Sequence, residues 1–244
     1  MQRRSRARYV NYKGFNIAVD VRLDIFINNK YYTTLYLSPE SIEEAVIGLL
    51  YGDGFILNVD EIDRINISGT KAHVFLKRDV DINPVRYDDC ATNIEVDIPM
   101  VNSNSTIDWK EILRLYSKFN QYTASAQFLV AMHTTAVYNI ESGEGIIVHD
   151  VSRHNTILKI VGHAVKRGIK LDKHVAFTTG RVSSDMVYRL ARLGLPIIIS
   201  MRGPLYSGVE SADKVGVTLI ANMKKSGVRR LTVLTHRYRI TSYK

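Results

Sequence analysis

Short stretches in which apolar and polar residues alternate run through the first part of the chain. Residues 22–27 and 31–37 alternate as the two strands of a hairpin do, with residues 28–30 as the turn between them. Residues 65–68 and 72–77 repeat this arrangement. A strand that alternates has one face on a core and one face toward solvent. We therefore predict two β-hairpins in this part of the chain.

A helix with one apolar face is predicted between the two hairpins. Ser38 is placed as its N-cap and Pro39 at its first helical position, where a proline loses no hydrogen bond. Gly52 and Gly54 end it. Its apolar residues recur at the spacing of one helix face, namely Ile42, Ala45, Val46, Leu49 and Leu50.

The second part of the chain has a different rhythm, in which short runs that are apolar throughout are each followed by a polar turn and a helical segment. The runs are residues 146–148, 175–177, 196–199 and 217–220, and the helices between them are expected near 154–167, 183–193 and 207–214. Runs of this kind are expected of strands covered on both faces, and strand–helix alternation implies parallel pairing.

These patterns predict an α/β protein with two parts. Residues 1–104 form an N-terminal α+β region with hairpins, and residues 105–244 form an α/β layered domain with a mostly parallel sheet. A helix is expected over 108–119, whereas 79–99 is interpreted as a loop-rich connection and 124–138 as apolar without an assigned element.

Charge and composition limit the partners and the compartment. The chain has 33 basic and 24 acidic residues in 244, a net charge of +9, which predicts an anionic partner. Nucleic acid, an acidic protein and a phosphate-bearing small molecule all fit. No apolar run reaches the roughly 18 residues of a membrane span, and no secretory signal begins the chain. We expect a cytoplasmic protein that does not enter a membrane.

Cys90 is the single cysteine of the sequence, in the run Asp88-Asp89-Cys90-Ala91-Thr92-Asn93. A lone thiol excludes an internal disulfide and a multi-cysteine zinc site. It is either a small core residue or a nucleophile that works alone. Its polar neighbours predict a loop. The seven histidines show no tight ligand spacing, so we expect no bound metal.

The residues that follow the four apolar runs carry the candidate chemistry, because ligands of open parallel sheets bind at the carboxyl ends of the strands. Each turn combines a cation with a hydroxyl, an amide or a glycine, and two of them open into helices with free N–H donors. This edge predicts a phosphate-bearing ligand. Walker and Gly-x-Gly-x-x-Gly motifs do not occur, and a Ser–His–Asp arrangement stays open although no Gly-x-Ser-x-Gly occurs. The turns are His149 to Asn155, Thr178 to Arg181, Ser200 to Gly203 and Asn222 to Gly227.

Several segments together resemble the FdhD family of formate dehydrogenase accessory sulfurtransferases. Asp150-Val151-Ser152-Arg153-His154-Asn155, with Lys159 and Gly162 behind it, is similar to the family's Asp-Val-Gly-Arg-His-Asn motif. The run from Thr179 to Val187 is similar to its Ser-Gly-Arg-Ala-Ser-x-Glu-Met-Val. His133 falls where the family has Gly-Gly-x-His-x-Ala, and the stretch from Leu37 to Gly54 resembles its N-terminal helix. Ser152 and the pair Ala131-Met132 replace glycines of these motifs.

The resemblance implies a cytidine-deaminase-like second domain, a homodimer and a role as sulfur carrier. A cysteine desulfurase would supply the sulfur as a persulfide, and the recipient would be a molybdenum or tungsten bis-pterin guanine dinucleotide cofactor for formate dehydrogenase. This cofactor would be a substrate, with no cofactor permanently bound. Cys90 occupies the place of the first cysteine of the family's Cys-x-x-Cys, and Asn93 replaces the second. The implied cofactor-binding residues are Asn222, Met223, Lys224, Lys225, Ser226, Gly227, Arg153, His154, Gly180 and Arg181.

Two other functions stay open. One is a chaperone that holds the cofactor without moving sulfur, and it stays open because Asn93 replaces the second cysteine. The net charge and the arginine-rich N-terminus are all that favours a nucleic-acid-binding protein, because no RNA-binding signature accompanies the tyrosines. Nucleic acid is therefore not the expected partner.

Overall fold

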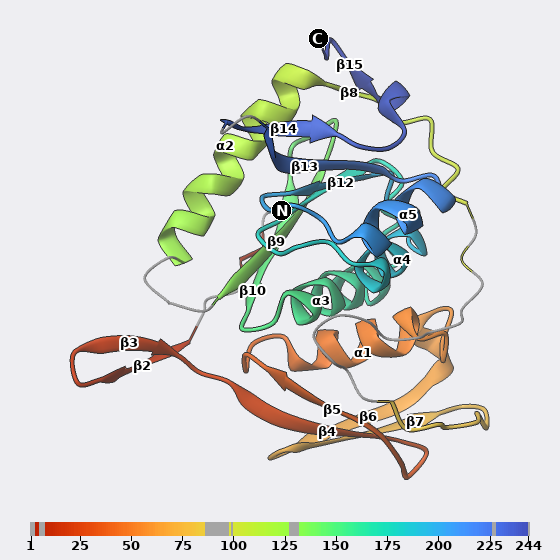
Figure 1. The fold of residues 1–244 in the computed structure, drawn as a ribbon. Helices are drawn as coiled ribbons and strands as arrows, with labels where there is room; N and C mark the ends of the chain where they lie inside the picture. The colour runs from red at the N-terminus through yellow and green to blue at the C-terminus, as the bar shows by residue number, and fades with distance from the viewer. Residues whose placement is uncertain are drawn as a thin grey trace.

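A computed structural model describes residues 3–4, 8–85, 98, 100–126, 132–225 and 228–243 (Figure 1). Its first layer is a four-stranded sheet in the order β5-β4-β7-β6, covered on one face by α1 (Ile42–Gly52). The strands are β4 (Val21–Ile27), β5 (Lys30–Leu37), β6 (Ile62–Ser68) and β7 (Lys71–Leu76). Both predicted hairpins and the end of the helix at Gly52 are confirmed.

The helix start differs from the prediction. Ser41, in a left-handed conformation, precedes α1, and Ser38 does not cap it. The amide of Ser38 instead donates to Asp150 Oδ2 at 3.0 Å, and its hydroxyl accepts from the amide of Val151 at 3.2 Å. Ser38 is buried, so its polar groups need partners, and here a contact distant in sequence supplies them in place of the local cap.

A seven-stranded sheet in the order β1-β10-β9-β11-β12-β13-β14 forms the centre of the molecule. The four predicted strands run in one direction and are confirmed. The described sheet is nevertheless mixed rather than mostly parallel, because β9 lies antiparallel between β10 and β11, and β14 is antiparallel to β13. Its strands are β1 (Arg3–Arg4), β9 (His133–Asn139), β10 (Gly145–Asp150), β11 (His174–Thr178), β12 (Ile197–Ser200), β13 (Thr218–Lys225) and β14 (Val228–Val233).

Helices cover both faces of this sheet. On one face, α2 (Trp109–Ala126) packs Ile112, Leu115 and Phe119 against the strands. On the other lie α3 (Arg153–Val165), α4 (Ser184–Ala191) and α5 (Tyr206–Lys214). The helix expected over 108–119 is thus confirmed, but it starts one residue later and continues to 126. The unassigned stretch 124–138 contains its end and most of β9.

The two layers meet where α1 crosses α3 at a pair of glycines. A Cβ atom at Gly48 would lie 1.9 Å from the carbonyl oxygen of Leu158, and one at Gly162 would lie 1.7 Å from that of Glu44. Such distances exclude any side chain at either position. One hydrophobic core includes residues of the first sheet, α1, α3 and α4. The boundary at 104/105 and the likeness to cytidine deaminases stay predictions.

Smaller elements complete the described chain. A hairpin of β2 (Tyr9–Tyr12) and β3 (Phe15–Ala18) extends from the body of the molecule (Figure 1). β8 (Ile107–Asp108) pairs with β15 (Ile240–Thr241), and two 3₁₀ turns span Val59–Glu61 and Arg237–Arg239. No described helix combines the length and the apolar character that crossing a bilayer requires.

Candidate functional site

The carboxyl ends of β10, β11 and β12 meet the start of β9 at one edge of the central sheet. The amide of Thr179 donates to the carbonyl of Thr134 at 3.0 Å, and the amide of Thr134 donates to the Thr179 hydroxyl at 3.0 Å. Ser200 Oγ donates to the carbonyl of Gly180 at 2.8 Å, and the amide of Met201 to that of Thr178 at 2.9 Å. These contacts bring the predicted turns after β11 and β12 together at this edge. We call this edge the rim, defined by His133, Arg153, His154, Thr179, Gly180, Arg181 and Arg202.

A close approach of two turns sets the position of Arg153. A Cβ atom at Gly180 would lie 2.7 Å from Cβ of Arg153, so the turn after β11 can approach the start of α3 only with glycine at 180. Arg153 and His154 stand in the first turn of α3, where free backbone N–H groups favour anions. Both residues belong to the predicted site, and the structure brings them next to Gly180 and the adjoining Arg181.

His133 lies at the centre of this positive charge. Its Nδ1 is 3.4 Å from Oγ1 of Thr179. Burial lowers its pKa, the charges of Arg153 and Arg202 lower it further, and Asp150 only partly opposes them. The ring is therefore neutral at pH 7 and can donate or accept a hydrogen bond, while the arginines beside it supply the positive charge.

His154 of the rim, together with Ser183 and Asp185, has the residue types of a hydrolase triad but not its geometry. His154 Nε2 lies 3.3 Å from Ser183 Oγ and 3.5 Å from Asp185 Oδ1, and the Ser183 hydroxyl donates to that same Asp185 oxygen. Burial raises the pKa of Asp185, but the hydrogen bond and charge of His154, with Arg189 and Ser183, lower it to about 2. A triad needs the aspartate and the serine on opposite nitrogens of the imidazole. Here both meet Nε2, so Ser183 is not an activated nucleophile.

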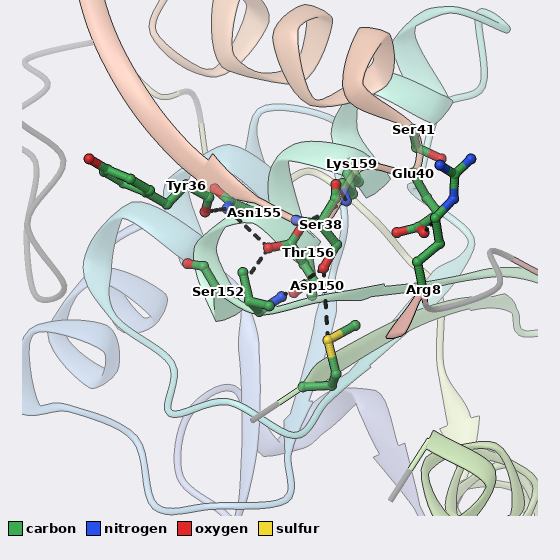
Figure 2. A network of polar contacts seen from close by, with 12 residues as sticks. Arg8, Tyr36, Ser38, Glu40, Ser41, Asp150, Ser152, Asn155, Thr156 and Lys159 are labelled. Carbon is green, nitrogen blue, oxygen red and sulfur yellow. Dashed lines mark hydrogen bonds and ion pairs between the residues drawn. The ribbon is translucent and has the colours of Figure 1, made fainter. Parts of the chain in front are cut away.

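A buried polar network supports the rim from below (Figure 2). Asp150 Oδ2 accepts from Lys159 Nζ at 2.6 Å, and neither side chain is exposed. Its other oxygen accepts from the amide of Ser152 at 2.9 Å and from Asn155 Nδ2 at 3.0 Å. Lys159 Nζ also donates to the carbonyl of Ser38 at 2.9 Å. Asp150, Asn155 and Lys159 thus satisfy one another internally, which leaves Arg153 and His154 as the residues of this motif that lie at the rim.

The remaining predicted site residues divide between a strand and the undescribed part. Asn222 and Met223 lie within β13, which continues to Lys225, so 222–225 are not the loop that the sequence predicted. The strand extends because β14 pairs with it from Ile220 to Lys225. Met223 still approaches the rim, since its Sδ would lie 3.9 Å from a Cβ at Gly203. Cys90, Asn93, Ser226 and Gly227, and the side chains of Lys224 and Lys225, lie outside the described residues.

Three rim residues, His133, Thr179 and Arg202, were not among the predicted binding residues. Thr179 and Arg202 follow predicted strands, and this position after β11 and β12 is the sequence signal for them, whereas His133 was indicated only by the family motif. The pairing of Lys159 with Asp150 has no local signal, because it depends on α3 folding back over the end of β10. Among the described residues, no group of three His, Cys, Asp or Glu side chains could hold a metal ion.

Comparison with known proteins identifies the relatives of this chain. The family model described as FdhD/NarQ matches residues 18–241. The sulfur carrier protein FdhD of Listeria innocua is 28% identical over 93% of this chain and 92% of its own. Protein FdhD of Methanocaldococcus jannaschii is 26% identical over 84% of this chain and 82% of its own. A crystal structure described as a formate dehydrogenase accessory protein, from Desulfotalea psychrophila, covers 96% of this chain and 97% of its own with a TM-score of 0.74 at 23% identity.

Proposed function

The chain belongs to the FdhD/NarQ family, and from this premise we propose that it carries sulfur for the maturation of formate dehydrogenase. In this proposal Cys90 takes a persulfide sulfur from a cysteine desulfurase. The sulfur then passes to the molybdenum or tungsten bis-pterin guanine dinucleotide cofactor, which is the substrate. The protein acts in the cytoplasm as a homodimer. The names of the Listeria innocua protein and the Desulfotalea psychrophila structure support the general role.

The rim is the observation that carries the proposal. It combines the cations Arg153 and Arg202 with the neutral ring of His133 at the carboxyl edge of the sheet. Arginines bind phosphate oxygens through paired hydrogen bonds, and a helix start adds backbone N–H donors. A guanine dinucleotide carries two phosphates and a base with donors and acceptors. The charges suit the phosphates, and a neutral imidazole suits the base or a ribose hydroxyl.

The sulfur step needs only one thiol. The Cys90 thiolate attacks the outer sulfur of the desulfurase persulfide, the sulfur–sulfur bond breaks, and the desulfurase thiolate leaves. Cys90 then carries the persulfide. With Asn at position 93, no neighbouring thiol can displace that sulfur as a disulfide forms. The persulfide therefore persists until the substrate accepts the sulfur. In that step the Cys90 thiolate leaves, and the two electrons that convert the sulfur to sulfide come from an external thiol reductant or from the substrate.

Mass spectrometry tests the sulfur step. After incubation with a cysteine desulfurase and cysteine, the protein should gain one sulfur atom on Cys90. Cys90→Ser should gain none while it still binds guanosine diphosphate as the wild type does. An unmodified Cys90, or a Cys90→Ser variant that still matures formate dehydrogenase, would contradict the carrier role.

Calorimetry with guanosine diphosphate tests the rim separately. Arg202→Ala should lower the affinity by about tenfold or more, because hydrogen bonds to charged groups contribute about 1.5–3 kcal/mol. Arg64→Ala is the matched control, since that arginine lies over the Phe75 ring in the first sheet, 4.1 Å from its centroid. Equal affinities of the two variants would contradict a phosphate site at the rim.

Asn93 favours one second candidate, a chaperone that holds the cofactor without moving sulfur. In that case guanosine diphosphate binds at the rim and Cys90 takes no sulfur. Binding to RNA that weakens steeply with salt, with neither of these properties, would instead support a nucleic-acid-binding protein.

A further inference from the structure

The hairpin of β2 and β3 presents an apolar face that is open to solvent. Its register places Val10 opposite Ile17 and Tyr12 opposite Phe15, so these four side chains share one face. They are 54%, 46%, 58% and 71% exposed, in that order. A lone two-stranded hairpin is marginally stable in water. This hairpin therefore exposes an apolar surface of the kind that a binding partner usually covers.

The hairpin is nevertheless a defined structure rather than a frayed end. Lys13 and Gly14 both have positive φ, at 51° and 86°, as the tight hairpin turn that matches strand twist requires. At its base, the amide of Val19 donates to the carbonyl of Arg8 at 3.1 Å. Arg8 Nε lies 3.5 Å from Oε1 of Glu40, just before α1. The hairpin is thus held at its base against the body, while its strands extend away from it (Figure 1).

The hairpin is separate from the part of the chain that defines the family. The family model begins at residue 18, the last residue of β3. Residues 9–17 therefore lie outside the part of the chain that the family model matches. A surface with this position fits recognition of a partner better than the sulfur chemistry itself.

The positive charge of the N-terminal sequence indicates that the partner carries negative charge. The first 19 residues contain five basic side chains and no acidic one. A second copy of the same hairpin would bring like charges together. It would also bury on the order of 400 Å² per copy, or about 800 Å² in all, against the roughly 1,200 Å² of a stable interface. A brief contact with an acidic partner suits both the charge and the area.

The hairpin edges favour a protein over a lipid surface. Each strand of a two-stranded hairpin has an outer edge of unpaired backbone N–H and C=O groups. In the hydrocarbon of a bilayer each unpaired group costs several kcal/mol, whereas a strand of a partner protein can pair with them.

We propose that the β2–β3 hairpin docks this protein on formate dehydrogenase, with the face of Val10, Tyr12, Phe15 and Ile17 in an apolar groove rimmed by carboxylates. The inference rests on the proposed function for the identity of the partner. The Desulfotalea psychrophila structure is described as a formate dehydrogenase accessory protein, and we take formate dehydrogenase as the partner on that basis. Lys13 at the hairpin turn adds positive charge that speeds the encounter with an acidic partner, and the apolar face sets the lifetime of the complex.

Binding of the full chain to purified apo-formate dehydrogenase, measured by biolayer interferometry, tests the proposal. The double variant Tyr12→Ser and Phe15→Ser should bind about tenfold or more weakly, because buried aromatic side chains dominate such interfaces. Tyr9→Ser, on the opposite face of the same strand, should bind within about twofold of the wild type. Lys13→Glu should weaken binding and reduce its dependence on salt, with the apolar pairs intact.

Three results would overturn the proposal. One is a double variant that binds the enzyme as well as the wild type does. Another is a change from dimer to monomer in sedimentation without loss of enzyme binding, which would assign the face to a second copy. The third is a double variant that no longer binds phosphatidylcholine–phosphatidylglycerol vesicles but still binds the enzyme, which would assign the face to a lipid surface. Sulfur loading of Cys90, measured on the same samples, shows separately whether the carrier function itself fails.

Discussion

Replacing Lys159 by methionine tests whether the buried network beneath the rim stabilises the fold as the geometry implies. Lys159 and Asp150 are both fully buried and 2.6 Å apart. Methionine keeps most of the volume of the lysine chain but removes the charge. Asp150 would retain its hydrogen bonds from Ser38, Ser152 and Asn155 and lose its counter-charge.

The expected cost follows from that uncompensated carboxylate. Removing one partner of a buried ion pair costs about 3–5 kcal/mol, against a total stability of about 5–15 kcal/mol. For a chain of this size each kcal/mol lowers the melting temperature by about 2–4 °C, so a decrease of about 6–20 °C is expected. Surface pairs such as Lys173 with Glu141 should cost less than about 1 kcal/mol by comparison.

Urea unfolding followed by circular dichroism measures the free energy of unfolding of each variant. The double variant Asp150→Asn and Lys159→Met should be less destabilised than the sum of the two single changes, by at least about 1 kcal/mol, because it leaves no unpaired charge. Lys173→Met is the matched control at an exposed pair. A Lys159→Met protein within about 1 kcal/mol of the wild type would refute the reasoning.

Two further predictions concern packing and pH. Gly162→Ala should cost about 2 kcal/mol or more in urea unfolding, since its Cβ would lie 1.7 Å from the Glu44 carbonyl. Gly203→Ala, whose Cβ would meet only Met223 Sδ at 3.9 Å, is the control, and equal costs would contradict the tight helix crossing. The carboxyl of Asp185, with its pKa lowered to about 2, should stabilise the fold by about 2 kcal/mol above about pH 4 and lose that contribution as the pH falls toward 2. The stability difference between the wild type and Asp185→Asn should therefore shrink over this range, and a difference that is constant down to pH 2 would contradict it.

Local patterns predicted most of the elements, and their direction in the central sheet, because each apolar run is bounded by polar turns. β9 was not predicted because its sequence, His133 to Asn139, mixes polar and apolar residues without a clear period, and because its antiparallel place depends on both neighbouring strands. The predicted start of α1 was wrong for a related reason. Ser38 has the local character of a cap, yet Asp150 and Val151 occupy its polar groups from 112 and 113 positions away.

For the site, the rule that strand ends meet at one edge was sufficient to place Arg153, His154, Gly180 and Arg181 together. It could not separate the residues that face a ligand from those that support them. Asp150 and Lys159 belong to the same motif as Arg153, and only the folded backbone shows that they are internal. Nor could it place Asn222 to Lys225, since the length of β13 is set by the pairing of β14.

The crossing of α1 and α3 has a consequence for how the chain is made. During synthesis α1 leaves the ribosome long before α3. The carbonyl of Ser38 can accept its hydrogen bond from Lys159 only after that residue, 121 positions later, has been made. Until then the apolar side of α1, including Val46 and Leu50, has only the first sheet to cover it. Contacts so distant in sequence form slowly, so the newly made N-terminal part is a natural client for chaperones that shield apolar surface.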